Sequence, residues 1–365
     1  MNQDLNRNPD NNSVTELEKK LLKKSILNSI KAYKAKRRLR YFSLTAAATI
    51  VVALGVFTFF KVYKNAPEIS NFVNTADIKE LKNSDKVKLV LQEGDDIKIE
   101  GENTSISYST QGSKVDIGDA KTLTQDTKVK NKVKFNTLIV PYGKRSALTL
   151  SDGSKVWLNS GSKFVYPVNF SEDDKRIVYL VEGEAAFDVA HNAEKPFIMM
   201  TEHQEIEVLG TVFNVSNYSD DTNNFVVLKS GSVQVSYPEE DANLLQEKKK
   251  LVITPGRMAN INKETKKVTS RRVNTDHYFS WQKGILIFEN SELNYIVRKL
   301  SRYYNIPIKI EDEALKKQTF SGSLDLKDSV EKVIETIIEA GVTAKLNYEK
   351  TNDNLILINQ TKENI

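Results

Sequence analysis

The sequence predicts a single-pass membrane protein with a short cytoplasmic helix, one transmembrane helix, an all-β extracytoplasmic domain and a small C-terminal α+β domain. Three observations indicate this fold class: an uncharged apolar run over 41–60, short alternating strands over 87–277, and two strand–helix units over 278–365. A basic segment, 1–40, precedes the apolar run, and a polar tether, 61–86, follows it.

The apolar run Tyr41–Phe60 contains neither a charged residue nor a proline. A helix of about 20 residues spans the roughly 30 Å of a bilayer's hydrocarbon core. Residues 1–40 hold 11 of the 53 basic residues and only 4 of the 48 acidic ones. The positive-inside rule therefore predicts a cytoplasmic N-terminus and places 61–365 outside the cytoplasm. A cleaved signal peptide is the alternative, but its basic region would be shorter and a small-residue cleavage site would follow.

The N-terminal segment predicts an amphipathic helix over about 14–33. Ser13–Glu16 has the pattern of a capping box, and apolar residues follow at helical spacing. Two interpretations are open: the helix lies on anionic membrane lipid, or it docks into a groove of a cytoplasmic partner. The apolar residues that would make the second contact are Leu17, Leu21, Ile26 and Ile30.

Residues 87–277 alternate between apolar and polar side chains in short runs separated by turns, which indicates an all-β domain. Leu89–Gly101 aligns without gaps with Leu148–Ser160, and each has a strand, an acidic-glycine turn and a second strand. The sequence therefore predicts stacked hairpins in a sandwich or roll. Trp157 and Phe187 are expected in its core.

Residues 278–365 predict a βαβ-βαββ arrangement in which a strand–helix–strand unit occurs twice. Asn290 is expected to cap the first helix, and Gly341 to follow the second. The predicted strands are Ile285–Phe288, Ile306–Ile310, Gln318–Leu324, Thr343–Tyr348 and Leu355–Ile358.

Several kinds of chemistry find no support in the sequence. The absence of cysteine excludes disulfides, thiolate metal sites and a cysteine nucleophile. His191, His203 and His277 are scattered, and no nucleotide-binding or metalloprotease motif is present, so no metal, cofactor or enzymatic activity is expected. Glu184 and Asp188 share a strand face and are expected as solvated residues rather than a hydrolytic pair. Because the basic excess is local, no nucleic acid is expected as a partner.

Six motifs within the β region resemble the FecR family of membrane-anchored sigma-factor regulators. They are Asp152–Pro167, Gly183–Ala190, Lys195–Phe197, Val208–Val215, Leu228–Val235 and Thr254–Gly256. The segment Trp281–Tyr304 is similar to the C-terminal domain of Bacteroidetes-type FecR proteins, which resembles the secretin/TonB short N-terminal fold. The resemblance covers roughly 85–360, and Ala186 departs from it where the family usually has an aromatic residue.

The resemblance implies an anti-sigma factor of the inner membrane with a periplasmic C-terminus. Its partners would be an extracytoplasmic-function sigma factor, the N-terminal extension of a TonB-dependent outer-membrane receptor and a site-2-type intramembrane protease. The sigma factor would bind the four apolar residues of the N-terminal helix. The receptor would contact the helix that begins near Asn290 or an edge strand formed by Leu355, Ile356, Leu357 and Ile358. The alternative is a membrane-tethered periplasmic binding or scaffold protein without a transcriptional role.

The resemblance also singles out the bond between Gly210 and Thr211. In some relatives this bond breaks by an N–O acyl shift, in which the threonine hydroxyl attacks the preceding carbonyl. The alternative is that Gly210 forms a β-bulge and has no chemical role.

Overall fold

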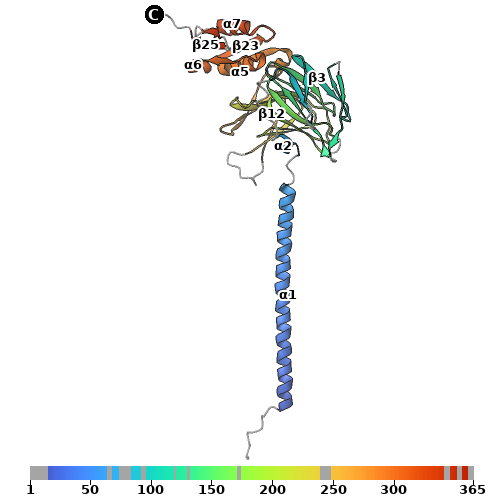
Figure 1. Ribbon diagram of the computed structural model, residues 1–365. Coiled ribbons are helices and arrows are strands. Elements are labelled where there is room, and N and C mark those ends of the chain that lie inside the picture. The colour runs from blue at the N-terminus through green and yellow to red at the C-terminus, as the bar shows by residue number, and fades with distance from the viewer. Residues whose placement is uncertain are drawn as a thin grey trace, which may run out of the picture. The chain divides into compact units, whose positions relative to one another are not determined.

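The structure is a computed structural model, and it divides the chain into two units, 1–66 and 67–365, each considered by itself (Figure 1). The residues that it describes are 15–63, 68–73, 84–91, 96–118, 121–129, 132–170, 174–238, 248–340, 346–351 and 356–360.

The first unit contains the long helix α1 (Glu16–Tyr63). Its N-terminus is closed by a reciprocal capping pair, because the Thr15 backbone N–H donates to the Glu18 carboxylate at 2.9 Å and the Thr15 hydroxyl accepts from the Glu18 N–H at 3.4 Å. The helix therefore starts two residues later than the predicted box at Ser13–Glu16 implies, and Ser13 itself lies outside the described residues.

The structure corrects the prediction of a transmembrane helix over 41–60 and the single-pass inner-membrane localisation built on it. Among the residues that are described, no helix is both long enough and apolar enough to cross a membrane.

The second unit begins with the short helix α2 (Glu68–Val73), followed by two large sheets. The first sheet runs in the order β2 (Asp96–Ile99), β1 (Val87–Val90), β8 (Phe135–Val140), β11 (Ser162–Pro167), β12 (Arg176–Asp188), β13 (Phe197–Met200), β14 (Glu205–Val208), β17 (Val233–Tyr237) and β18 (Lys249–Ile253). The second runs in the order β5 (Lys121–Thr124), β4 (Lys114–Ile117), β3 (Asn103–Tyr108), β9 (Arg145–Thr149), β10 (Lys155–Leu158), β12, β15 (Val212–Asn217), β16 (Asn223–Ser230), β19 (Arg257–Asn262) and β20 (Val268–Arg272). A small ladder joins β6 (Lys128–Val129) and β7 (Lys132–Val133).

Strand β12 belongs to both sheets and joins them. Its first part pairs with β11 up to Glu182, and its second part pairs with β15 from Gly183 onward. Gly183 stands at this transition with φ +107°, a conformation that favours glycine. The chain thus turns from one sheet into the other at a single residue.

The β domain is confirmed as a two-layered arrangement with one main core. Apolar side chains of both sheets meet in it, and Phe187 stacks on Phe213 with ring centroids 4.8 Å apart. The two hairpins predicted from their aligned sequences are present as β1–β2 and β9–β10, in different sheets. Trp157 is only half-buried and packs in a smaller cluster with Trp281.

The C-terminal part is confirmed as a small α+β domain. It follows α4 (Asp276–Phe279) and a 3-10 turn, η1 (Ser280–Lys283). Its elements are β21 (Ile285–Glu292), α5 (Leu293–Tyr304), β22 (Ile308–Ile310), α6 (Glu313–Lys316), β23 (Thr319–Asp325), α7 (Val330–Ala340), β24 (Leu346–Lys350) and β25 (Ile356–Gln360). Strands β21 and β23 form one sheet, and β22-β25-β24 form another.

Two details of this domain differ from the predictions. Asn290 does not cap α5 but lies within β21, at a bulge with φ +45°, and Glu292 precedes the helix instead. Strand β25 is the central strand of its sheet rather than an edge, because it pairs with both β22 and β24.

Candidate functional site

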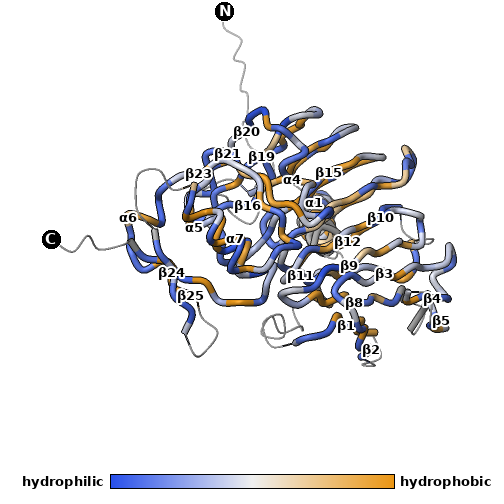
Figure 2. The backbone as a smooth tube through the Cα atoms, turned by 90° about the horizontal axis from the view of Figure 1, so that it is seen from above, coloured by the Kyte–Doolittle hydropathy of each residue, from blue (hydrophilic) through white to orange (hydrophobic). Residues whose placement is uncertain are grey.

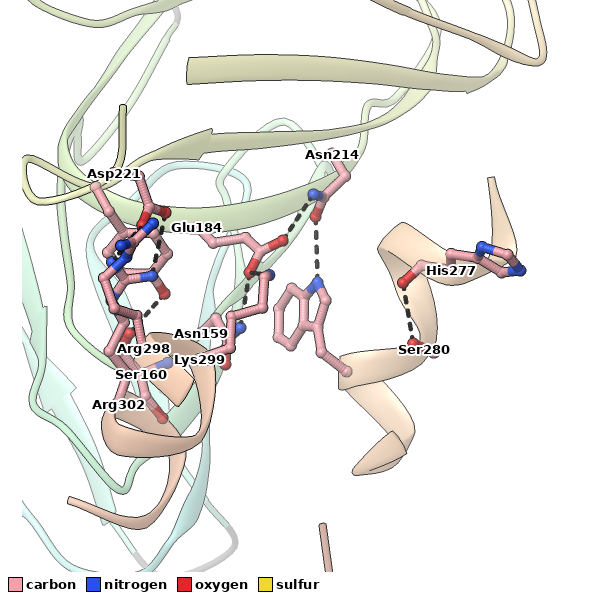
Figure 3. A network of polar contacts seen from close by, with 12 residues as sticks. Asn159, Ser160, Glu184, Asn214, Asp221, His277, Ser280, Arg298, Lys299 and Arg302 are labelled. Carbon is pink, nitrogen blue, oxygen red and sulfur yellow. Dashed lines mark hydrogen bonds and ion pairs between the residues drawn. The ribbon is translucent and has the colours of Figure 1, made fainter. Parts of the chain in front are cut away.

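Helix α5 presents one face to the core of its own domain and another to the β domain. Leu293, Ile296 and Leu300 are buried in the C-terminal core. The basic residues Arg298, Lys299 and Arg302 lie on the other side of the helix and reach carboxylates of the β domain (Figure 3). These contacts form the candidate site, which we call the interdomain network: Asn159, Ser160, Glu184, Asn214, Tyr218, Asp220, Asp221, Trp281, Arg298, Lys299 and Arg302.

Glu184 is the centre of one half of the interdomain network. Its side chain is only 1% exposed, and its Oε2 accepts hydrogen bonds from Lys299 Nζ at 3.1 Å and Asn159 Nδ2 at 2.9 Å. Its Oε1 accepts from Asn214 Nδ2 at 3.1 Å, and Asn214 in turn accepts from the indole N–H of Trp281 at 3.3 Å. The carboxylate is therefore buried with a counter-charge and a full set of donors.

Burial alone would lower the pKa of Lys299, because it penalises the ammonium ion. The adjacent Glu184 carboxylate outweighs this and raises the pKa of Lys299 above its usual range. Lys299 is thus a permanent cation at neutral pH. The expectation that Glu184 and Asp188 are both solvated is wrong for Glu184, and only Asp188 is exposed.

Asp221 is the centre of the other half of the network. Its Oδ1 accepts from Arg298 Nε and Arg302 Nη2, each at 2.9 Å, and its Oδ2 accepts from Arg302 Nη1 at 3.2 Å. Arg302 also pairs with Asp220, and its guanidinium carbon lies 3.7 Å from the centroid of the Tyr218 ring. The bidentate Arg302–Asp221 pair is the strong, directional form of this interaction.

The turn between β8 and β9 makes a further contact with α5. The Gly143 N–H donates to the Arg302 carbonyl at 2.9 Å, so it satisfies a carbonyl of the last helical turn. The guanidinium of Arg145 lies 4.5 Å from the centroid of the Tyr303 ring. Helix α5 is thereby fixed to the β domain by side-chain charges and by a backbone hydrogen bond.

The interdomain network is suited to coupling two domains. Glu184 and Asp221, its two buried carboxylates, are held by cations. In the part of the chain that the structure describes, no group of His, Asp or Glu side chains could hold a metal ion. The chemistry available here is recognition between domains.

Asp221 gives the network a predicted pH dependence. Burial would raise its pKa, but the hydrogen bonds and charge of Arg302 outweigh burial and lower the pKa below the usual value. A lowered folded-state pKa stabilises the protein above the unfolded value of about 3.9, and this contribution is lost as the pH falls through the folded pKa. Asp221→Asn should therefore cost about 3 kcal/mol in the free energy of unfolding at pH 7 and progressively less below pH ~4.

Urea unfolding of the full chain between pH 7 and pH 3 measures this difference. Asp188→Asn, which removes an exposed carboxylate, is the matched control and should change the free energy of unfolding by less than about 0.5 kcal/mol. A cost of Asp221→Asn that stays constant across the pH range contradicts the assignment.

The four predicted sigma-binding residues are all exposed on α1. The exposed fractions are 71% for Leu17, 60% for Leu21, 51% for Ile26 and 45% for Ile30. At about 100° per residue, Leu17 and Leu21 share one face, whereas Ile26 and Ile30 share another that begins about 140° away. The apolar residues thus form two faces instead of one stripe, and sigma binding stays a prediction.

Gly210 and Thr211 lie between β14 and β15. A Cβ atom at Gly210 would lie 2.6 Å from His191 Nδ1 and 2.8 Å from its Cα, so the close approach to His191 requires glycine here. The Thr211 hydroxyl donates to the Ser232 carbonyl at 3.0 Å. The register shift between β15 and β16 falls at Val212 rather than at Gly210. Cleavage of the Gly210–Thr211 bond stays a prediction.

The predicted receptor-contact strand has no free edge. Ile356 and Ile358 are 0% and 1% exposed, and β25 is paired on both sides. Leu357 is half-buried, and Leu355 lies outside the described residues. Receptor contact stays a prediction, but strand addition at β25 itself has no place to occur.

The interdomain network was not predicted from the sequence. A signal for it exists in α5, where Arg298, Lys299 and Arg302 fall on the side of the helix away from its apolar face. Its partners Glu184 and Asp221 lie 115 and 81 residues away from Lys299 and Arg302. No local pattern connects them.

The chain thus combines a two-sheet β domain with a small α+β domain, and both parts are similar to known proteins. The FecR protein family matches residues 136–234, and the family described as FecR, C-terminal matches residues 285–358. Two crystal structures of a candidate anti-sigma factor from Parabacteroides distasonis ATCC 8503, at 1.65 and 2.50 Å resolution, are 27% identical to the chain with a TM-score of 0.55. They cover 62% of this chain and 99% and 100% of their own chains. No curated protein matches. Over these regions, the family matches and the similar structures support a FecR-family anti-sigma factor.

Proposed function

We propose that this protein is a sigma-factor regulator of the anti-sigma type. Two findings support the proposal: FecR and FecR C-terminal regions follow one another in the chain, and the similar structures from Parabacteroides distasonis are of a candidate anti-sigma factor that aligns over nearly its full length. The residues that we expect to contact the sigma factor are large apolar side chains that lie exposed on α1.

Helix α1 offers enough apolar surface for a protein partner. Fully burying one leucine or isoleucine side chain is worth about 1.5–3 kcal/mol. Burial of Leu17, Leu21, Ile26 and Ile30 together would therefore supply on the order of 8 kcal/mol, the free energy of micromolar binding, before the costs of association. Because the residues form two faces, the partner would clasp the helix rather than accept one side of it.

The double variant Ile26→Asp with Ile30→Asp is expected to weaken sigma binding at least 100-fold, since both carboxylates would have to be desolvated on one face. The measurement is co-purification and titration calorimetry of the full chain with each extracytoplasmic-function sigma factor of its own cell. Lys20→Gln with Lys31→Gln lowers the net charge by the same amount at positions about 40° or more around the helix from either face, and is the control. If none of these sigma factors binds the full chain, or if the aspartate variant binds like the wild type, the proposal fails.

We also propose that the signal arrives from the N-terminal extension of a TonB-dependent receptor and enters at the C-terminal domain. The interdomain network supports this step, because Glu184–Lys299 and Asp221–Arg302 would transmit a displacement of α5 to the β domain. Binding of that extension to the full chain, measured by calorimetry, tests the proposal, and an absence of binding at micromolar concentration would defeat it.

A further inference from the structure

A cavity of about 840 Å³ lies between the end of β20 and strand β21. The consecutive residues 286–292 of β21 line it, together with 271–274 at the end of β20. Aromatic and apolar side chains also line it: Phe225, Met258, Tyr278 and Tyr295. Viewed from above, β19, β20 and β21 lie next to one another (Figure 2). Because consecutive residues of β21 line the cavity, rather than every second one, the strand presents an edge of its backbone to it.

The register of β21 shows which backbone groups are free. The Leu326 N–H donates to the Gly284 carbonyl at 2.8 Å, one position before the first pair of the β21–β23 ladder. Hydrogen-bonded pairs alternate in an antiparallel ladder, so Leu286 and Phe288 bond to β23 whereas Ile287 directs its N–H and C=O away from it. Among the described strands β21 pairs only with β23. The Ile287 backbone is therefore an unused donor and acceptor at the cavity.

Strand β20 also has an edge that no described strand pairs with, although its Ser270 carbonyl accepts a hydrogen bond from Arg257 Nη2 at 3.3 Å. The Val273 N–H donates to the Gly256 carbonyl at 2.9 Å, and Arg271 pairs with Met258 two residues earlier. Arg272 therefore directs its backbone groups away from β19. Two unpaired strand edges consequently border one cavity.

The charges around the cavity are not all neutralised. Arg271 and Arg272 are exposed, and among the described residues neither has a carboxylate partner, although Arg271 reaches the Tyr278 hydroxyl at 3.4 Å. Glu289 and Glu292 are also exposed at the cavity. Arg298 and Lys299, by contrast, are satisfied within the interdomain network. An occupant thus meets unpaired positive charge on the β20 side and unpaired negative charge on β21.

We propose that this cavity binds an extended segment of a protein partner as an added strand on β21, with acidic side chains toward Arg271 and Arg272 and a basic side chain toward Glu289 or Glu292. An added strand would pair with the Ile287 N–H and C=O, the mode in which main-chain bonds give affinity and alternate side chains give specificity. Alternate apolar residues of the segment would contact Tyr278 and the other apolar lining residues. An extended polypeptide offers both a donor and an acceptor to the Ile287 backbone, whereas a small anion offers acceptors alone.

The test uses the full chain and a phage-displayed library of random peptides of roughly 12 residues, long enough for one strand. Selection on the wild type should enrich peptides that alternate apolar residues and carry both charges. Their affinity, measured by calorimetry, should fall at least 10-fold in Ile287→Pro. Proline lacks an N–H, and at Ile287 that N–H is not used by β23, so the fold should persist. Ile287→Val keeps the N–H and is the control.

A charge reversal provides a second variant that leaves the backbone unchanged. Arg271→Glu with Arg272→Glu should weaken the selected peptides at least 10-fold, and replacing their acidic residues by lysine should restore binding to this variant but not to the wild type. Peptides that bind wild type and both variants equally would overturn the proposal, as would a selection that enriches no peptide. Since this test measures only peptide binding and not sigma binding, its result is independent of the proposed function.

Discussion

Gly183→Ala is expected to destabilise the protein by about 4 kcal/mol. Gly183 has φ +107°, and a Cβ atom there would lie 2.4 Å from Ser162 Cα and 2.2 Å from Ser162 Oγ. Ser162 cannot move aside easily, because it is fully buried and its hydroxyl hydrogen-bonds both the N–H and the C=O of Glu184 at 3.1 Å. Backbone strain and a backbone clash therefore act together at the residue where β12 passes between the sheets. Urea unfolding of the full chain measures the loss.

Gly153→Ala separates the two contributions. Gly153 also has a positive φ, +84°, but a Cβ atom there meets nothing within 4 Å. Its substitution should cost only the left-handed backbone penalty of about 1–2 kcal/mol. Equal losses at Gly153 and Gly183 would show that the transition between sheets does not depend on close packing.

The contrast between these glycines shows what sequence patterns could reveal. The acidic-glycine turn at Gly153 is a local signal, and the β9–β10 hairpin that it predicts is present. Gly183 was recognised only as part of a motif. Its role depends on Ser162 of a neighbouring strand, and the sequence does not show which strands are neighbours. The parallel pairs β12–β13 and β3–β9 were missed for the same reason.

The candidate site was harder to predict than the fold, because its residues contradict their usual preferences. An alternating strand pattern assigns Glu184 to solvent. The residue is instead buried, and its carboxylate pairs with a lysine 115 positions away. Helical periodicity similarly suggested one apolar stripe on α1, but summing the angles between Leu21 and Ile26 divides it into two faces. Each predicted C-terminal strand overlaps an observed one, although β21 continues to Glu292 where a helix cap was predicted. The order that places β25 in the centre follows from its parallel pairing with β22. Hydrophobic periodicity and turn residues thus predict helices and strands, but they do not predict which charged residues pair across long sequence distances.

Lys299→Met is expected to cost about 3 kcal/mol in the free energy of unfolding, because it leaves the Glu184 carboxylate buried without its counter-charge. Asn159 and Asn214 would still donate to that carboxylate, which limits the loss. Helix α5, which loses this contact with the β domain, should also unfold locally more often. Its amide hydrogen exchange should therefore accelerate relative to that of the strands in the main β core. Chemical denaturation and hydrogen exchange of the full chain measure the two effects.

A double-mutant cycle with Glu184→Gln isolates the ion pair. If the pair is what matters, the double variant should lose clearly less than the sum of the two single variants, since neither buried charge then remains unpaired. Lys229→Met is the control, because it breaks a comparable lysine–carboxylate contact with Asp276, at 3.2 Å, whose side chains are 45% and 73% exposed. It should cost at most about 1 kcal/mol. Additive losses at Glu184 and Lys299, or a control variant that loses as much as Lys299→Met, would mean that the two domains are not held together by this charge pair.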